Sequence, residues 1–306
     1  MHTLPRVILV LVLVLAGLGA WLWTPDKPRE ALEARYATGP EAFLDVAGLR
    51  LHVRASGPVD APALILLHGF GASLQTWDTW ASQLPQYRVI RFDLPGFGLT
   101  GADPTGDYRD SRSVAVLIGL MDRLHLEHAT LAGHSLGGRI AWKFAALHPE
   151  RVDKLVLISP DGYASPGFEY GKAPAVPAVL KLMRYVLPRS LVKMNLAPGY
   201  ANADVMTEAL VTRYYDLMLA PGVRDAMLAR LEQTVLEDPS PLLARIRTPV
   251  LLLWGELDRM IPFSNSADYM RALPQSTLVP LPGVGHLPQE ESPVAAVEPL
   301  KAFLAR

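Results

Sequence analysis

The chain has 306 residues, half of them hydrophobic, which is enough to bury a large core. Its formal net charge of -1 excludes the basic surface of a nucleic-acid-binding protein. Because the chain contains no cysteine, disulfides, thiol catalysis and cysteine metal sites are excluded as well.

Residues 1–25 form an apolar segment unlike the rest of the chain. Residues 7–23 are uncharged and end in Trp21 and Trp23, which suit a headgroup boundary. As a helix this run spans about 25 Å, slightly under a bilayer core of roughly 30 Å. Residues 18–20 are a poor signal-cleavage site, because leucine replaces the usual small residue. We expect a membrane-anchoring hydrophobic helix with the rest of the chain periplasmic or extracellular; a cleaved signal peptide with secretion and a cytosolic hydrophobic tail are the alternatives.

The region after the apolar segment changes from a linker to an alternating pattern. Residues 26–40, rich in charge and proline, predict a linker with one helical stretch over 29–36. A β-hairpin is expected next, and short apolar runs then alternate with helical patterns, which is typical of parallel βαβ units. The predicted strands are residues 41–46, 49–55, 63–67, 88–92, 129–132, 155–159, 248–254 and 277–281, and the predicted helices between them are 111–124 and 136–147.

The alternation stops between residues 161 and 240. This stretch contains proline clusters and helical patterns over 178–186, 204–219 and 223–235, together with five of the nine methionines. Methionine adapts its shape to irregular apolar surfaces, so we expect a helical cap that packs on the body or encloses an apolar cavity. The predicted division is residues 41–160 as the first part of the core, 161–240 as the cap and 241–306 as the second part of the core.

The most informative motif runs from Gly133 to Gly137, where Ser135 stands between an apolar strand and a helix. Such a tight turn strains the serine backbone and exposes Oγ, and small flanking residues let the neighbouring chain pass. The N–H of Leu136 lies at the start of the helix, where it can donate to an oxyanion. The motif predicts that Ser135 is a nucleophile.

A serine nucleophile needs a base and an acid, and chain order supplies both. His286 follows the last predicted strand and can take the serine proton. Asp258 follows the strand over 248–254 and can fix the tautomer of the imidazole. Asp161, which follows the strand over 155–159, is an alternative acid. Asp258 is preferred because Asp161 also fits as the hinge into the predicted cap.

The second oxyanion donor should come from the loop after an early strand. His68-Gly69-Phe70-Gly71 follows the strand over 63–67, and we expect the N–H of Phe70 to be that donor. His68 is expected to brace its own loop, and Asp93 to support the turn at residues 95–96.

These motifs together resemble the α/β-hydrolase superfamily over residues 41–306. The segments that carry the resemblance are His68-Gly69-Phe70-Gly71, Asp93-Leu94-Pro95-Gly96-Phe97-Gly98, Gly133-His134-Ser135-Leu136-Gly137-Gly138, Trp254-Gly255-Glu256-Leu257-Asp258 and Gly285-His286. The resemblance implies an α/β fold with a mostly parallel eight-stranded sheet, helices on both faces and an inserted helical cap. It also implies a Ser-His-Asp hydrolase with no metal or organic cofactor, in which the side chain of His134 points away from the attack site.

The identity of the nucleophile narrows the reaction. Relatives that dehalogenate or open epoxides use aspartate at the position of Ser135. Carbon-carbon bond hydrolases of the superfamily usually carry asparagine where this chain has His134, which disfavours that activity. We expect hydrolysis of a carboxylic ester with an apolar acyl group, lipid-like or a lactone, through an acyl-enzyme. Carbon-carbon bond hydrolysis, perhydrolase or haloperoxidase-like chemistry, and a membrane-tethered binding protein without activity are the alternatives.

Overall fold

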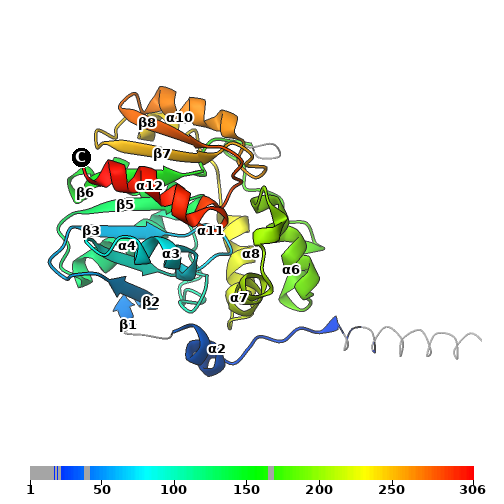
Figure 1. Cartoon of the computed structure of the whole chain (residues 1–306). Helices are drawn as coiled ribbons and strands as arrows, with labels where there is room; N and C mark the ends of the chain where they lie inside the picture. The colour runs from blue at the N-terminus through cyan, green and yellow to red at the C-terminus, as the bar shows by residue number, and fades with distance from the viewer. Residues whose placement is uncertain (1–16, 18, 20–21, 38–41, 165–168) are drawn as a thin grey trace, which may run out of the picture.

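The computed structural model describes residues 17, 19, 22–37, 42–164 and 169–306. Its centre is an eight-stranded sheet in the order β1-β2-β4-β3-β5-β6-β7-β8 (Figure 1). β2 pairs antiparallel with β1 and with β4, and all other neighbours are parallel. The predicted mostly parallel sheet of eight strands is therefore confirmed.

The observed strands lie close to the predicted ones. Their bounds are β1 Ala42–Val46, β2 Leu49–Ser56, β3 Ala63–Leu67, β4 Arg88–Phe92, β5 Ala129–His134, β6 Val152–Ile158, β7 Val250–Gly255 and β8 Ser276–Leu281. The helices that accompany the sheet are α3 Asp78–Ser82, α4 Asp110–Arg123, α5 Leu136–Leu147, α9 Ser240–Leu243, α10 Ser266–Ala272, α11 Pro288–Glu291 and α12 Pro293–Leu304.

The sheet is buried on both faces, which explains why its central strands read as continuous apolar runs. In β3, Leu64 and Leu66 pack into one core cluster with α3 and α12. Ile65 and Leu67 belong to the other cluster, with α4, α5 and α10. Successive side chains of a strand point to opposite faces, so one short run feeds both layers.

A set of helices interrupts the alternation after β6. We call these the inserted helices: the 3-10 turn η3 Leu180–Arg184, α6 Arg189–Leu196, the turns η4 Ala197–Gly199 and η5 Ala203–Val205, α7 Glu208–Met218 and α8 Val223–Gln233. α6 contacts α7, and α8 contacts both α7 and η3. They lie together to the right of the sheet in Figure 1.

Two predicted helices of this region differ from the observed ones. The pattern over 178–186 predicted a helix, but the structure has only the short turn η3, bounded by Pro177 and Pro188. The pattern over 204–219 predicted one helix, but α7 begins at Glu208, because the Thr207 side chain caps it by accepting from the Leu210 N–H. The observed helices that were not predicted are α3, α6, α9, α10, α11 and α12.

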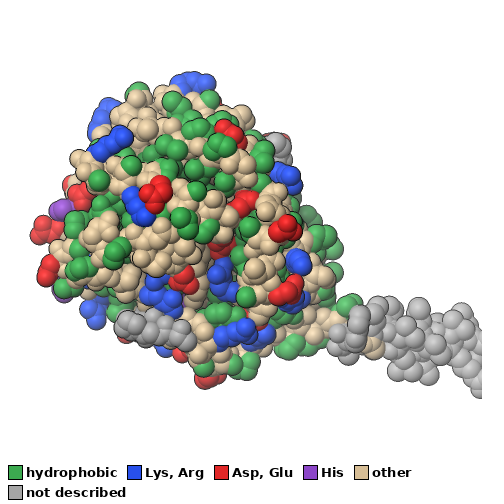
Figure 2. All heavy atoms as spheres, in the orientation of Figure 1, with side chains coloured by type: hydrophobic (Ala, Val, Ile, Leu, Met, Phe, Trp, Pro, Cys, Tyr) green, Lys and Arg blue, Asp and Glu red, His purple; other side chains and the backbone are tan. Residues whose placement is uncertain are grey.

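The linker is docked against the inserted helices. Its helix α2, Arg29–Tyr36, has the predicted bounds. The buried carboxylate of Asp216 in α7 accepts from Lys27 Nζ at 2.6 Å, Arg35 Nη1 at 3.0 Å and Tyr36 Oη at 2.7 Å. On the face of the molecule shown in Figure 2, basic and acidic side chains are interspersed.

Most of the predicted anchor over residues 1–25 lies outside the described residues. In the part of the chain that the structure describes, no helix has the length and apolar character needed to span a membrane.

Candidate active site

The turn between β5 and α5 has the strained geometry that its sequence predicts. Ser135 joins the two elements with a φ of 52°, which a non-glycine residue adopts only at a cost of about 1–3 kcal/mol. A Cβ on Gly133 would lie 2.3 Å from the Gly137 carbonyl oxygen, and one on Gly137 would lie 2.3 Å from that of Leu67. The two glycines therefore permit the close approach that holds Ser135 in place.

The structure brings His286 and Asp258 together. His286 Nδ1 lies 2.7 Å from Asp258 Oδ2, and both residues are buried. The other carboxylate oxygen, Oδ1, accepts from the N–H groups of Met260 and Ile261, each at 2.8 Å. With its Nδ1–H donated to the carboxylate, the imidazole keeps Nε2 as the free base.

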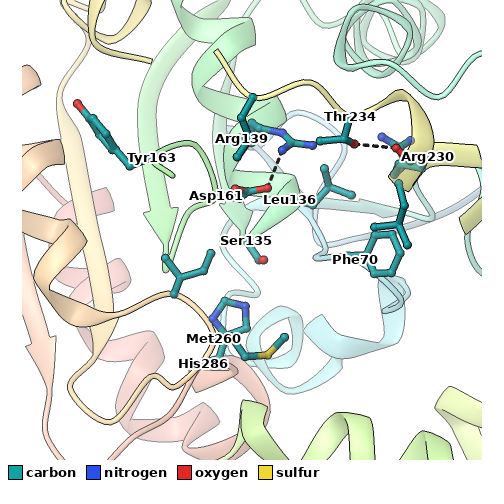
Figure 3. A pocket seen from close by; sticks show the side chains of 13 residues that line it. Phe70, Ser135, Leu136, Arg139, Asp161, Tyr163, Arg230, Thr234, Met260 and His286 are labelled. Atoms are coloured by element: carbon teal, nitrogen blue, oxygen red, sulfur yellow. Dashed lines mark hydrogen bonds and ion pairs between the residues drawn. The ribbon is translucent and has the colours of Figure 1, made fainter. Parts of the chain in front are cut away.

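Asp161, the alternative acid, has a different partner. Its Oδ2 accepts from Arg139 Nη1 at 2.7 Å, and its backbone N–H donates to the Ser135 carbonyl at 3.0 Å. Asp161 therefore lies next to the nucleophile without holding the histidine. Figure 3 shows Ser135 between Asp161 on one side and His286 on the other.

The two expected oxyanion donors flank the nucleophile. Phe70 and Leu136 line a cavity together with Ser135. Leu136 is the first residue of α5, so its N–H has no acceptor within the helix. A Cβ on Gly69 would lie 3.2 Å from Ser135 Cβ, so the loop of Phe70 lies close to the turn at Ser135. The assignment of the two N–H groups as oxyanion donors stays a prediction.

His134 differs from its expected role. Its side chain was expected to point away from the attack site, but its ring centroid lies 4.6 Å from that of His286. His134 Nε2–H donates to the His286 carbonyl at 2.7 Å. Burial, and then the nearby His286, hold the pKa of His134 well below its usual value, so the ring is neutral. No sequence signal predicts this contact, since the two residues are 152 positions apart.

His68 and Asp93 make the hydrogen bonds that the sequence predicts for residues that support the loops after β3 and β4. His68 is buried, with Nδ1 2.8 Å from the Gly69 carbonyl oxygen, and its Nε2 accepts from the Leu94 N–H at 2.9 Å. Asp93 accepts from the N–H groups of Leu74 and Leu99, both at 2.7 Å. These contacts hold the loop of Phe70 to the loop after β4.

The loop of His286 is tied to the inserted helices by its backbone. The Gly199 carbonyl accepts from the His286 N–H at 2.8 Å and from the Leu287 N–H at 3.2 Å. Because these bonds join η4 to the histidine itself, the position of the inserted helices and that of His286 are coupled.

A buried carboxylate strengthens this connection. Glu290 in α11 accepts from Tyr200 Oη at 2.6 Å and Tyr214 Oη at 3.0 Å, and it forms an ion pair with Arg213. Burial, and then the acidic neighbours, raise the pKa of both tyrosines above their usual range, so both hydroxyls stay protonated donors. Three side chains of the inserted helices and their loops therefore hold the helix that follows His286.

Two cavities meet at the nucleophile. The larger, of about 410 Å³, is lined mainly by apolar side chains of the inserted helices, among them Met183, Met218 and Met227. The smaller, of about 220 Å³, extends towards Arg139 and Asp161 (Figure 3). Both Ser135 and His286 line both cavities. No group of three or more His, Asp or Glu side chains within the described residues is placed to hold a metal ion.

Three known proteins show what the chain is similar to. It is 27% identical to the 2-hydroxy-6-oxo-6-phenylhexa-2,4-dienoate hydrolase of Burkholderia cepacia, over 86% of this chain and 93% of that protein. It is 30% identical to a 2-hydroxy-6-oxononadienedioate/2-hydroxy-6-oxononatrienedioate hydrolase of Pseudomonas putida, with the same coverage. The crystal structure of a bacterial membrane phospholipase A superposes with a TM-score of 0.74 at 28% identity and covers 98% of each chain.

The family match agrees with the geometry of the site. The alpha/beta hydrolase fold family matches residues 62–293, which include Ser135, Asp258 and His286. The chain therefore belongs to the alpha/beta hydrolase fold family, and within it the chain is a serine hydrolase.

Proposed function

We propose that this serine hydrolase cleaves carboxylic esters of apolar acids, with Ser135, His286 and Asp258 as its catalytic residues. The observation that carries the proposal is that Ser135 lines a 410 Å³ cavity whose wall consists largely of methionine and leucine side chains. Such a cavity removes an acyl chain from water, and each buried CH₂ contributes roughly 0.8 kcal/mol. The inserted helices supply most of this wall and act as the cap of the site.

The reaction follows from the order of the contacts. His286 Nε2 takes the proton of Ser135 Oγ, which attacks the ester carbonyl and forms the acyl-enzyme. Asp258 stabilises the imidazolium through its bond to Nδ1. The N–H groups of Phe70 and Leu136 stabilise the oxyanion. His286 returns the proton to the leaving alcohol and then activates the water that releases the acid.

Labelling with a fluorophosphonate tests the proposal. We expect Ser135 to be labelled, the Ser135→Ala variant to stay unlabelled, and its turnover of p-nitrophenyl esters to fall by about 10⁶. A series of acyl chains then measures the preference for apolar acids. Folded wild-type protein that takes no label and cleaves no ester would support a hydrolase-like binding protein instead.

Carbon-carbon bond hydrolysis is the second candidate. It is favoured by two of the relatives, which are named as dienoate and dienedioate hydrolases at 27% and 30% identity. His134 argues against it, because carbon-carbon bond hydrolases of the superfamily that the sequence resembles usually carry asparagine at this position. An assay with 2-hydroxy-6-oxo-6-phenylhexa-2,4-dienoate beside the ester series separates the two: faster turnover of the dienoate would replace the ester proposal.

The apolar run over residues 7–23 supports a further part of the proposal, a membrane anchor with the catalytic domain periplasmic or extracellular. The similarity to a membrane phospholipase over 98% of the chain also favours it. We expect the full chain to stay with membranes through alkaline carbonate washing and to be released by detergent. Protease added to spheroplasts, whose outer envelope has been opened, should reach it; protection from that protease would reverse the proposed orientation.

A further inference from the structure

We propose that the smaller cavity holds the alcohol half of the ester and that Asp161 selects alcohols with a free hydroxyl group, such as glycerol. The inference rests on the proposed ester hydrolysis at Ser135 and goes beyond it by naming the substrate class: acyl esters of polyols. Asp161 would then be a specificity-determining residue.

Both cavities are lined mainly by apolar side chains, but only the smaller one also contains an ion pair, that of Arg139 and Asp161. The larger one is apolar, and its 410 Å³ suits an acyl chain. The smaller one, at 220 Å³, lies below the roughly 300 Å³ of a typical ligand site, so it takes only a short group. Its wall is mostly apolar, and the polar group in it with an oxygen left open to a ligand is the carboxylate of Asp161. A short polar group on the far side of the ester bond fits this wall.

The carboxylate of Asp161 has the capacity to accept another hydrogen bond. Its side chain is 30% exposed, against 5% for its partner Arg139. Oδ2 is engaged by Arg139, whereas no donor to Oδ1 exists among the residues that the structure describes. A carboxylate oxygen has two lone pairs, so Oδ1 can accept from a ligand that enters the cavity.

Asp161 is also held rigidly next to the reacting atoms. Its N–H donates to the Ser135 carbonyl, and its own carbonyl accepts from Trp142 Nε1 and from Tyr269 Oη, each at 3.0 Å. In Figure 3 its carboxylate lies beside Ser135. A hydroxyl group on the alcohol half of an ester bound at Ser135 would therefore enter the cavity that this carboxylate lines.

The charges around the cavity favour a neutral ligand group. Arg139 is neutralised by Asp161 and by Asp110, whose Oδ2 lies 3.2 Å from Arg139 Nε. A ligand ammonium would lie near the guanidinium of Arg230, which also lines the cavity. A ligand anion would meet the exposed carboxylate of Asp161. A neutral hydroxyl group can donate to Asp161 and is repelled neither by the arginine nor by the carboxylate.

A pair of substrates with the same acyl chain tests the inference. Monohexanoylglycerol and propyl hexanoate differ only in the two free hydroxyl groups. We define the selectivity ratio as kcat/KM for the first divided by kcat/KM for the second. The wild type should give a ratio of about ten or more, since a hydrogen bond to a charged group contributes about that factor.

The variants Asp161→Ala and Asp161→Asn locate the source of the selectivity. We expect Asp161→Ala to lower the ratio about tenfold and Asp161→Asn to lower it less, because the amide oxygen still accepts. Any general loss of activity cancels, since both esters are measured on each variant. Asp153→Asn is the matched control, an exposed carboxylate paired with His128 away from both cavities, and should keep the wild-type ratio.

The outcomes separate this inference from the proposed function. A wild-type ratio near one, or an unchanged ratio in Asp161→Ala, overturns the role of Asp161 while ester hydrolysis stands. A wild-type protein that cleaves neither ester overturns the proposed function and this inference with it. If Asp161→Ala fails to fold, the selectivity ratios of the wild type and of Asp161→Asn still test the role of Asp161.

Discussion

Two carboxylates, those of Asp258 and Asp161, lie near the turn at Ser135, and their different hydrogen-bond partners indicate different roles. Asp258 gives one oxygen to His286 and the other to two backbone N–H groups, so its position is fixed on both sides. Asp161 is paired with Arg139 and remains partly exposed to the smaller cavity. Asp258 fixes the tautomer of His286 because it accepts the hydrogen bond from Nδ1. Asp161 has no such effect, because its side-chain hydrogen bond goes to Arg139.

We therefore expect an asymmetric response to the same substitution. Asp258→Asn should lower kcat for p-nitrophenyl hexanoate by about 10⁴, because the wrong tautomer of His286 is then favoured. Asp161→Asn should lower it far less, since this ester has no hydroxyl for Asp161 to bind. Steady-state kinetics of the two purified variants measure the difference. If Asp161→Asn is the crippling change, the acid has been assigned wrongly.

Two buried neutral histidines make the stability of the protein depend on pH. Burial is the main cause that lowers the pKa of both His68 and His134. Below the unfolded value of 6.5, the unfolded chain binds protons that the folded chain does not. Stability is thus fully present above this pH and is lost as the pH falls towards the folded pKa, by up to about 1.4 kcal/mol per pH unit for each histidine.

Urea unfolding between pH 7 and pH 5 measures this slope. His134→Gln keeps a donor for the His286 carbonyl but cannot titrate, so its slope should be smaller by about one proton. An identical slope in the variant and the wild type would show that His134 is not the titrating group.

Among the secondary-structure elements, the contact between α7 and α11 has the most direct consequence for the site. α11 follows His286 within two residues, and its Glu290 is held by Arg213 and Tyr214 of α7. The side chains of Glu290 and Arg213 are only 5% and 21% exposed. Loss of one partner would leave the other charge poorly solvated in the interior.

Glu290→Ala should therefore lower the free energy of unfolding by about 3 kcal/mol and reduce kcat with it. Glu298→Ala is the control: that carboxylate is 61% exposed and pairs with Lys301 on the surface of α12, where a pair contributes less than about 1 kcal/mol. Urea denaturation and kinetics of both variants provide the comparison. Equal losses of unfolding free energy in the two variants would show that the buried ion pair of Glu290 stabilises the protein no more than the exposed pair of Glu298.

For the molecule as a whole, the linker and the inserted helices form one connected layer. Asp216 joins them by accepting from Lys27, Arg35 and Tyr36, and α7 carries the contact on to Glu290 and the loop of His286. A segment that the sequence predicts as a linker with one helical stretch is therefore part of the folded body.

Asp216→Asn should release this segment. Hydrogen bonds to a charged group contribute about 1.5–3 kcal/mol, so trypsin should cleave after Arg29 and Arg35 about tenfold faster. Limited proteolysis followed by mass spectrometry measures the rate. Asp153→Asn, again an exposed carboxylate, should leave the rate unchanged, and unaltered cleavage in Asp216→Asn would contradict the docking role.

The sequence by itself determined the fold and the strained turn at Ser135, because both depend on local signals. Apolar runs between helical patterns predict parallel strands, and Gly133 and Gly137 are needed only where backbones approach closely. The strained turn at Ser135 follows from its neighbours alone. The limit of periodicity appears at η3, which is a 3-10 turn where the pattern predicts a helix, and at α7, which begins only after the Thr207 cap.

Only the tertiary structure decided how the remaining groups combine. Asp161 and Asp258 both follow strands of one sheet, and chain order does not say which of them reaches His286. The contact of His134 with His286 and that of Arg139 with Asp161 join different elements across the core. Such pairings depend on the distance between side chains after packing, and residue types along the chain carry no measure of that distance.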